Sequence, residues 1–388
     1  MADFSEFESI SPYQTDEEAV NAFEKIAETP LLGQISEYFY PDEPSDYLKN
    51  VILSLKSIDD FQVMVMTKLV ERAIDMTVRT FSYDGVANIN KDVKFLALSN
   101  HRDIILDPAI TQTVLYKNGI PMTEIAVGDN LIQNKYIEYL VRSNRMIKVI
   151  RGVSARELYL SSQMLSKYIR MSVVSGKSSI WLAQRQGRTK NGYDTTEQGL
   201  LKMLDMSGNP GEFKHNFEEL NIIPMSISYQ IEPCDILKAR ELVISKDHKY
   251  VKAPGEDLHS ILVGVTQQKG NIHLNIGRPL SSEEISLAAL CDKNDRYQYI
   301  RHAVNFRIVD GYRLWNNNYI AYDLLNGTTR FADKYTQAEL EWFVEYMAKQ
   351  IESVEPELDR EALRHIFLEI YANPIVTKDI IARGEVLV

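Results

Sequence analysis

The sequence places a histidine close to two carboxylates. In FLALSNHRDIILDPAI, residues 95–110, His101 is followed by Asp103 after one residue and by Asp107 after five. A neutral imidazole paired with a carboxylate is held in one tautomer and becomes more basic, which suits a general base near pH 7. Alternatively, Asp107 caps a helix that Pro108 begins, because aspartate is favoured at the N-cap and proline at the first helical position. The stretch therefore predicts a catalytic pair, or a strand followed by a capped helix.

Cationic side chains follow two later apolar runs. NRMIKVIRG places Arg151 behind one run, and IWLAQRQGRTKNG places Arg185, Arg188 and Lys190 around Gly187 behind another. A planar guanidinium can donate two parallel hydrogen bonds to two oxygens of a phosphate, and glycine lets the backbone approach a ligand closely. These residues predict an anion site of the kind that a phosphate would occupy. The structural alternative is a solvated glycine turn.

Other catalytic signatures are missing from the sequence. VVSGKSSIW contains Gly-Lys-Ser, but Met171 occupies the first glycine position of a phosphate-binding loop, and the order is helix then strand. There is no Gly-x-Ser-x-Gly elbow and no His-Glu-x-x-His helix. The two cysteines, Cys234 and Cys291, have neither zinc-ribbon nor disulfide-scaffold spacing. We therefore expect no metal and no bound cofactor.

The periodicity of apolar residues suggests which elements position these groups. Short β-branched runs alternate with helical patterns, and the expected strands are 93–98, 124–127, 146–150, 179–183, 222–228 and 272–276. The expected helices are 108–117, 131–142, 155–174 and 196–204, and Ser154 and Glu157 form a capping box at the third. This alternation predicts an α/β fold with a mixed, mostly parallel sheet flanked by helices. His101 and Arg151 would then lie at the carboxyl edge of the sheet, where such folds build their sites.

Helical regions are expected on both sides of this sheet. We divide the chain into an acidic helical N-terminal region (1–82), an α/β domain (83–280) and a helical C-terminal region (281–388). One helical pattern runs from Asp46 to about Phe81. The apolar stripe in its second half predicts a buried helix or, alternatively, a helix that lies in a membrane interface.

Charge is distributed unevenly along the 388 residues, whose formal net charge is −11. Residues 1–50 carry a net charge of −10, whereas residues 135–190 carry +10. The basic segment predicts an anionic partner, although solvated faces are the simpler explanation of a charge run. No run approaches the roughly 18 apolar residues of a spanning helix, and the N-terminus does not look like a signal peptide. We expect a cytoplasmic protein that associates peripherally with the inner face of a membrane.

Four stretches resemble, in order, the sequence blocks of the glycerolipid acyltransferases, the family of glycerol-3-phosphate and lysophosphatidate acyltransferases. SNHRDIILDPAI resembles the first block, Asn-His, four residues, then Asp, often with Pro after it. Here five residues precede Asp107, whose following proline matches, whereas Asp103 follows after one. NRMIKVIRG resembles the second block, IWLAQRQGRTKNG the third with Gln186 in place of a glutamate, and NIIPMSISY the fourth. The resemblance covers roughly residues 83–230.

The resemblance implies an O-acyltransferase of phospholipid synthesis. It would move a fatty acyl group from an acyl carrier protein or coenzyme A thioester to a hydroxyl of glycerol-3-phosphate or lysophosphatidate. His101 would be the general base and Asp107 its partner. The implied substrate-binding residues are Asn100, Arg102, Arg151, Arg185, Gln186, Gly187 and Arg188.

Two alternatives remain open beside this implied function. The acceptor could be another lysolipid or an amino-acid lipid. The protein could instead be a non-catalytic lipid- or acyl-carrier-binding homologue, which Gln186 and the His–Asp spacing favour. In either case the expected partners are an acyl thioester, a phosphorylated acceptor and an anionic membrane surface, and not a nucleic acid.

Overall fold

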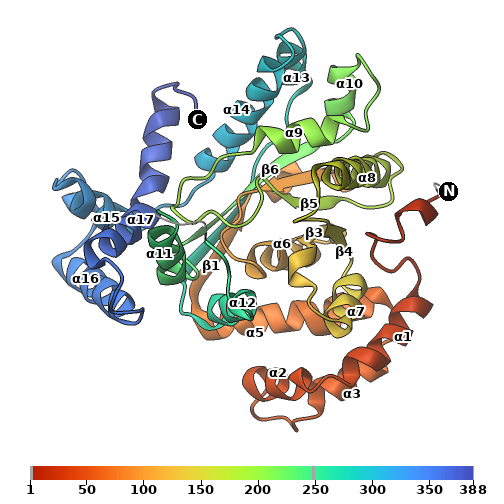
Figure 1. The fold of residues 1–388 in the computed structure, drawn as a ribbon, viewed down its shortest axis with the longest axis horizontal. Coiled ribbons are helices and arrows are strands. Elements are labelled where there is room, and N and C mark those ends of the chain that lie inside the picture. Colours follow the sequence, from red (N-terminus) through yellow and green to blue (C-terminus); the bar gives the residue numbers. More distant parts are fainter. Residues whose placement is uncertain (1–2, 247–249, 388) are drawn as a thin grey trace.

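The computed structural model describes residues 3–246 and 250–387 (Figure 1). Within them a seven-stranded sheet runs through the centre, in the order β1-β7-β6-β2-β5-β3-β4. The strands are β1 Val78–Asp84, β2 Leu96–Ser99, β3 Glu124–Gly128, β4 Met146–Val149, β5 Ile180–Ala183, β6 Ile222–Tyr229 and β7 Gly270–Ile276. Neighbouring strands in this sheet are parallel except β6 and β7, which confirms the predicted α/β fold with a mixed, mostly parallel sheet.

Helices cover both faces of the sheet. They include α6 Leu106–Lys117, α7 Lys135–Ser143, α8 Ala155–Val174, α9 Gln198–Asp205, α10 Phe213–Glu218, α11 Asp235–Ile244 and α12 Glu256–Thr266. Alternate residues of β2 point to opposite faces, so Leu96 and Leu98 pack in one core with α8 and α9, and Ala97 packs in the other with α6. Figure 1 shows α8, α9 and α10 on one side of the sheet and α5, α6 and α7 on the other.

The N-terminal part is helical, but the single helix expected from Asp46 to about Phe81 is wrong. The chain forms α1 Asp16–Ala27, α2 Leu31–Phe39, α3 Tyr47–Ser54, α4 Ile58–Asp60, the π-helix Phe61–Thr67 and α5 Lys68–Thr77. At Val78 the backbone becomes extended and continues as β1, because residues 78–84 pair with β7. Phe61, Val65, Val70 and Ala73 of the stripe are buried, although Met76 near its end is exposed, and this favours the buried-helix alternative.

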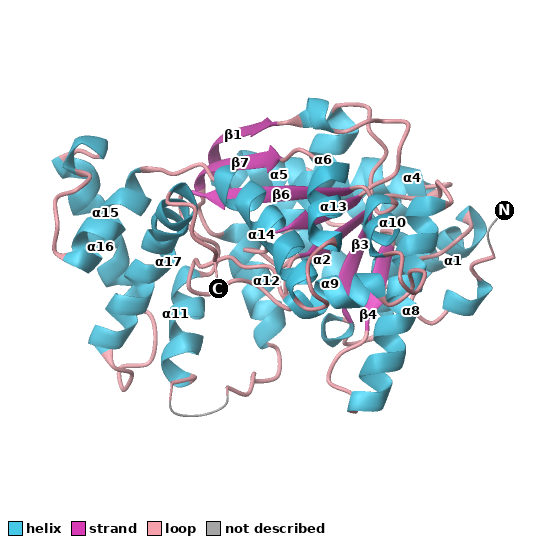
Figure 2. Ribbon diagram, turned by 90° about the horizontal axis from the view of Figure 1, so that it is seen from above, coloured by secondary structure: helices cyan, strands magenta, loops and turns pink. Residues whose placement is uncertain are grey.

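The C-terminal part is also helical. It contains α13 Ser282–Ala289, α14 Asp295–Asp310, α15 Asn316–Asn326, α16 Gln337–Glu352 and α17 Arg360–Ala382. Helices α15, α16 and α17 share a hydrophobic core with α11, which Figure 2 shows at one end of the molecule. No helix in the described ranges is long and apolar enough to cross a membrane.

Candidate active site

His101 and Asp107 lie in contact just beyond the carboxyl end of β2. The Nδ1 atom of His101 is 2.9 Å from Oδ2 of Asp107. The imidazole keeps 14% of its side-chain surface exposed, whereas the carboxylate keeps 1%. The edge of the Trp181 ring lies against the imidazole, with ring centroids 5.8 Å apart. Because Nδ1 faces the carboxylate, Nε2 is the nitrogen left to exchange a proton with a substrate.

The Asp107 carboxylate is held on both of its oxygens. Oδ2 accepts the backbone N–H of Arg102 at 2.5 Å and that of Asp103 at 2.9 Å, and Oδ1 accepts the Tyr229 hydroxyl at 2.7 Å. Burial and the nearby Asp107 carboxylate raise the pKa of Tyr229 well above its usual value, so this hydroxyl stays a donor. The carboxylate therefore has one fixed position relative to the imidazole.

The expectation that Asp107 caps a helix is wrong, because Ile105 occupies the N-cap position and the side chain that binds the N–H groups at this helix start is that of Asp103. Helix α6 begins at Leu106, which puts Asp107 in its first turn. Oδ1 of Asp103 accepts the backbone N–H groups of Ile105 at 2.9 Å and Leu106 at 2.8 Å. Burial and the Asp107 carboxylate raise the pKa of Asp103. The two acids thus have different roles, and only Asp107 contacts the histidine in the described part of the chain.

The glycine loop that follows β5 runs beside His101. The backbone N–H of Gln184 donates to Ser99 at 2.8 Å, and that of Thr189 donates to the His101 carbonyl at 2.8 Å. Between them Gly187 has φ +73°, a conformation that side chains other than glycine rarely adopt. The loop therefore carries Arg185, Gln186 and Arg188 to the edge of the sheet at which His101 lies, and Gln186 is exposed there.

Cations gather around this loop. Burial, together with the positive charges of Lys252, Arg188 and Arg185, lowers the pKa of Lys190 to about 8. Burial raises the pKa values of Asp103 and Cys234, and the Arg188 charge offsets part of both shifts, which places the guanidinium near both. Nε of Arg185 and Nη1 of Arg188 are buried without a hydrogen-bond partner among the described residues. An anion in the loop would meet these donors.

Arg151 follows β4 and lies at the same edge of the sheet. Its backbone N–H donates to Asp129 Oδ1 at 3.1 Å. Its guanidinium covers Gly128, where an added Cβ would come within 2.8 Å of it. Burial lowers the pKa of Arg151. Strand β3 lies between β4 and β5, so Arg151 reaches across the end of β3, on the side toward the strand that carries the glycine loop.

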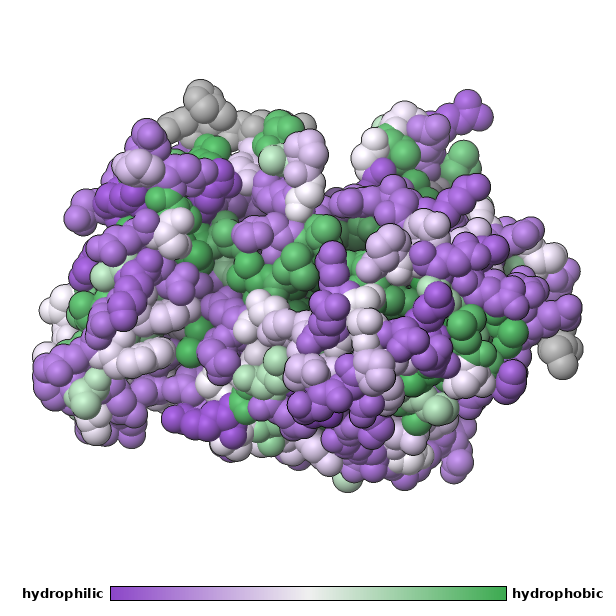
Figure 3. Space-filling model, turned by 90° about the horizontal axis from the view of Figure 1, so that it is seen from below, coloured by the Kyte–Doolittle hydropathy of each residue, from purple (hydrophilic) through white to green (hydrophobic). Residues whose placement is uncertain are grey.

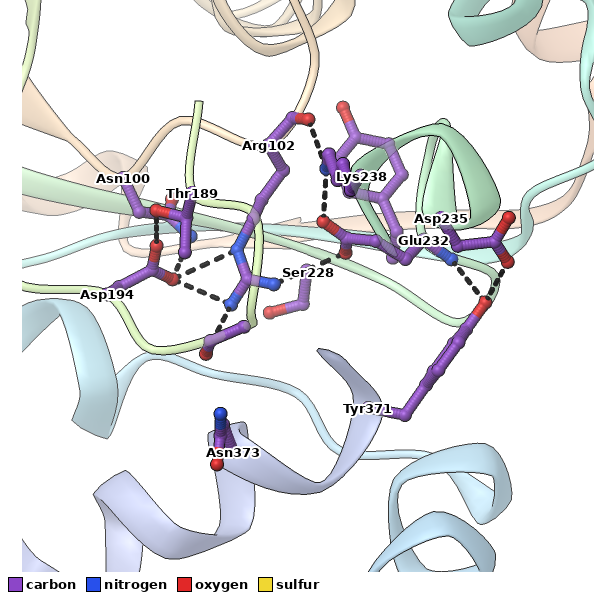
Figure 4. A network of polar contacts seen from close by, with 12 residues as sticks. Asn100, Arg102, Thr189, Asp194, Ser228, Glu232, Asp235, Lys238, Tyr371 and Asn373 are labelled. Carbon is purple, nitrogen blue, oxygen red and sulfur yellow. Dashed lines mark hydrogen bonds and ion pairs between the residues drawn. The ribbon is translucent and has the colours of Figure 1, made fainter. Parts of the chain in front are cut away.

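Asn100 and Arg102 face a buried polar network instead (Figure 4). Nδ2 of Asn100 donates to Asp194 at 3.2 Å and to the carbonyl of Ile227 at 3.0 Å. The Arg102 guanidinium donates to Asp194 at 2.7 Å and to Glu232 at 3.3 Å. These buried partners occupy both side chains, so we do not include them among the proposed substrate contacts.

Local sequence patterns did not predict the residues that bind Arg102 in this network. Lys238 is buried and donates to the Arg102 carbonyl at 2.7 Å and to Glu232 at 2.6 Å. Arg102 is thus held at its guanidinium by Asp194 and at its carbonyl by Lys238. No motif or spacing predicted that Asp194, Glu232 and Lys238 would contact Arg102, because they lie about 90 to 135 residues after it along the chain.

The basic segment at residues 135–190 carries less free charge than its net of +10. Six of its cations form ion pairs with carboxylates: Arg145 with Asp59, Lys148 with Glu138, Lys167 with Glu6, Arg170 with Glu219, Lys177 with Glu124 and Lys190 with Glu241. Two of these acids belong to the N-terminal part of the chain. The six cations outside these pairs are Lys135 and Arg142 of α7, Arg151, Arg185 and Arg188 at the sheet edge, and Arg156 at the start of α8.

The chemistry available at the site follows from what surrounds His101. Across residues 3–246 and 250–387 no serine or cysteine is hydrogen-bonded to the imidazole, and no group of acidic, cysteine or histidine side chains could hold a metal ion. A histidine with a fixed carboxylate can take a proton from a substrate hydroxyl, and nearby arginines can bind an anionic substrate.

Comparison with known proteins adds little to this geometry. The chain matches no protein-family model, and no curated protein matches it in sequence. Among solved structures it is similar to the 1-acyl-sn-glycerophosphate (LPA) acyltransferase PlsC from Thermotoga maritima, with a TM-score of 0.39 and 11% sequence identity. The alignment covers 74% of this chain and 92% of that one. Similarity at this level carries no functional argument, so function has to be inferred from the site.

Proposed function

We propose that this protein is an O-acyltransferase. It moves a fatty acyl group from an acyl carrier protein or coenzyme A thioester to a hydroxyl of glycerol-3-phosphate or lysophosphatidate. The observation that supports this most strongly is the contact between His101 Nδ1 and Asp107 Oδ2, 2.9 Å long, at a strand end bordered by arginines. The sequence blocks that contain these residues resemble those of glycerolipid acyltransferases.

The proposed reaction uses His101 twice. Nε2 takes the proton of the acceptor hydroxyl as its oxygen attacks the thioester carbonyl. When the tetrahedral intermediate collapses, the C–S bond breaks and the thiolate takes that proton back as a thiol. Asp107 stabilises the imidazolium between these steps and keeps the ring oriented. Because no serine or cysteine in the described chain bonds to His101, the acyl group passes directly to the acceptor.

The arginines supply the binding part of the proposal. Arg185 and Arg188 flank Gly187 beside His101, and Arg151 lies at the same edge of the sheet, over the end of β3, which neighbours β5. A phosphate on the acceptor would neutralise this charge and would satisfy the unpartnered guanidinium nitrogens of Arg185 and Arg188. This arrangement favours a phosphorylated acceptor over a neutral one.

The test is acyl transfer by the purified protein. Labelled acyl carrier protein and coenzyme A thioesters are incubated with glycerol-3-phosphate, lysophosphatidate or an acyl-glycine lipid, and His101→Ala is run in parallel. We expect acylated glycerol-3-phosphate or lysophosphatidate that depends on His101. Transfer only to the amino-acid lipid would change the proposed acceptor. The absence of transfer from either thioester to any acceptor would reject the enzyme and leave a binding protein.

A further inference from the structure

The first turns of α8 expose hydrophobic side chains on more than one face of the helix. Residues 152–160, which we call the α8 tip, are all exposed, and they include Val153, Leu158, Tyr159 and Leu160. Successive residues of a helix point about 100° apart, so the last three of these cover more than half of its circumference. A partner protein with one binding face could cover only part of this surface.

A second hydrophobic projection lies on the chain that leads into α12. Residues 250–262, which we call the α12 tip, expose Val251, Leu258 and Leu262. The side chain of Val251 is 80% exposed, which is rare for a valine without a partner. Both tips therefore present apolar surface that nothing in the described chain covers.

The two tips lie on either side of one hollow. In Figure 2, α8 and α11 both extend beyond the arrowheads of β3 and β4, and α12 lies next to α11. The α8 tip begins three residues after the end of β4 and contains the first turns of α8, which starts at Ala155. Figure 3, from the opposite side, shows a hollow with hydrophobic residues on its floor between two projecting parts of the surface.

Both tips are attached to the proposed site. An added Cβ at Gly264 of α12 would come within 2.1 Å of Asp103 Oδ2, so this helix packs directly against the turn that follows His101. Asn130, between β3 and α7, hydrogen-bonds Asp257 of the α12 tip at 3.2 Å. The α8 tip follows Arg151 directly in the chain.

Cations accompany the hydrophobic side chains. Arg156 is exposed on the α8 tip, where the exposed Glu157 follows it, and Lys252 of the α12 tip is paired with Asp257 of the same tip. Arg185 and Arg188 lie in the glycine loop. The charge of Lys252 lowers the pKa of Lys190 in this loop, so the α12 tip lies near the loop. Apolar and aromatic side chains with arginine and lysine beside them suit the boundary between the hydrocarbon and an anionic headgroup layer.

We propose that the α8 tip and the α12 tip insert into the surface of an anionic lipid bilayer, so that the hollow between them opens onto the lipid. The role of this insertion rests on the proposed function: a lysolipid acceptor could then pass from the bilayer to His101 without crossing water. The attachment itself depends on the exposed side chains and not on catalysis. Raising the salt concentration should weaken it without abolishing it, since the apolar insertion is not screened.

The test is co-sedimentation of the full chain with vesicles. Vesicles of phosphatidylcholine with phosphatidylglycerol are compared with vesicles of phosphatidylcholine alone. The variant is the triple change Leu158→Ser, Tyr159→Ser and Leu160→Ser. The matched control changes exposed hydrophobic residues of α13, its C-cap and α14, Leu287→Ser, Leu290→Ser and Phe306→Ser. We expect at least tenfold weaker binding to the anionic vesicles for the α8 variant and no change for the control.

Several outcomes would overturn this inference. One is a wild-type protein that does not bind the anionic vesicles, and another is an α8 variant that binds as well as the wild type. If the α8 variant instead loses a dimer in sedimentation velocity, the tips contact a second copy of this chain. Acyl transfer to water-soluble glycerol-3-phosphate without vesicles should be the same in the α8 variant and the wild type. Absence of this transfer in the wild type would reject the acyltransferase proposal, whatever the vesicle binding.

Discussion

Asp107 lies with Oδ2 2.9 Å from Nδ1 of His101, and the same oxygen accepts two backbone N–H groups of the turn that connects the two residues. The five residues between them thus form a closed turn around the carboxylate. The spacing that departs from the resembled family motif by one residue is therefore compatible with a direct contact between imidazole and carboxylate.

Asp107→Asn should lower kcat by about 10²–10⁴-fold, because an amide cannot stabilise the imidazolium and favours the wrong tautomer. Asp103→Asn should have a smaller effect on kcat, since an asparagine oxygen can still cap α6. Steady-state kinetics of the two variants, with circular dichroism as a check of folding, decide between the carboxylates. A larger loss of kcat for Asp103→Asn would contradict the assignment.

Arg188→Ala should raise the KM for a phosphorylated acceptor by roughly 10- to 150-fold and leave the KM for the acyl donor nearly unchanged. The expected size follows from a charge-assisted hydrogen bond of about 1.5–3 kcal/mol. Arg151→Ala should behave in the same way, and lysine at either position should restore binding only in part. Arg156→Ala, assayed with glycerol-3-phosphate in the absence of lipid, is the control.

The opposite pattern at Arg188 would be informative. A raised KM for the donor with an unchanged KM for the acceptor would mean that the loop binds the carrier's phosphopantetheine or its acidic surface. The phosphate-acceptor assignment would then be abandoned before the acyltransferase itself.

Lys238→Met should destabilise the protein by about 3–5 kcal/mol, because it leaves the buried Glu232 carboxylate without one of its two cations. Lys25→Met, which breaks an exposed pair with Glu28, should cost about 0–1 kcal/mol. Urea unfolding of both variants measures the difference. Equal free energies of unfolding would mean that the network around Arg102 does not stabilise the fold.

Asp235 should make stability depend on pH. Burial raises its pKa from 3.8 to about 6, although the hydroxyls of Tyr371 and Tyr346 donate to it at 2.6 and 2.8 Å. A carboxyl whose pKa is higher in the folded state costs stability progressively as pH rises from about 4 to about 6, and the cost is constant above that. Asp235→Asn removes this cost. Its melting temperature relative to the wild type should therefore rise between pH 4 and pH 6, and a flat difference would contradict the buried charge.

Local sequence patterns predicted the elements that depend on local signals. Helix α8 has the predicted bounds, since Ser154 and Glu157 form the expected capping box at its start. Strand β5 begins only one residue later than predicted. Its apolar run is short and bounded on both sides, so both of its ends could be predicted closely. The contact between His101 and Asp107 could also be predicted from the sequence, because only five residues separate them.

Features that depend on distant pairing were not predicted. Strand β1 continues the apolar pattern of α5, and only its pairing with β7, about 190 residues later, makes it extended. Asp107 was predicted as a helix cap because Pro108 follows it, but Asp103 competes successfully for the free N–H groups of α6. Asn100 and Arg102 were assigned to substrate from the family resemblance alone, and their contacts with acid and carbonyl groups 90 residues or more away were not predicted.

The most direct test of the central claim is the turnover number of His101→Ala in thioester-dependent acylation of glycerol-3-phosphate or lysophosphatidate, measured on protein whose melting temperature matches the wild type. The side chain lies beyond a strand end and contributes little to the core, so folding should be intact. If His101 is the general base, kcat should fall by about 10²–10⁴-fold. A folded His101→Ala protein that transfers acyl groups at nearly the wild-type rate would contradict the proposed mechanism.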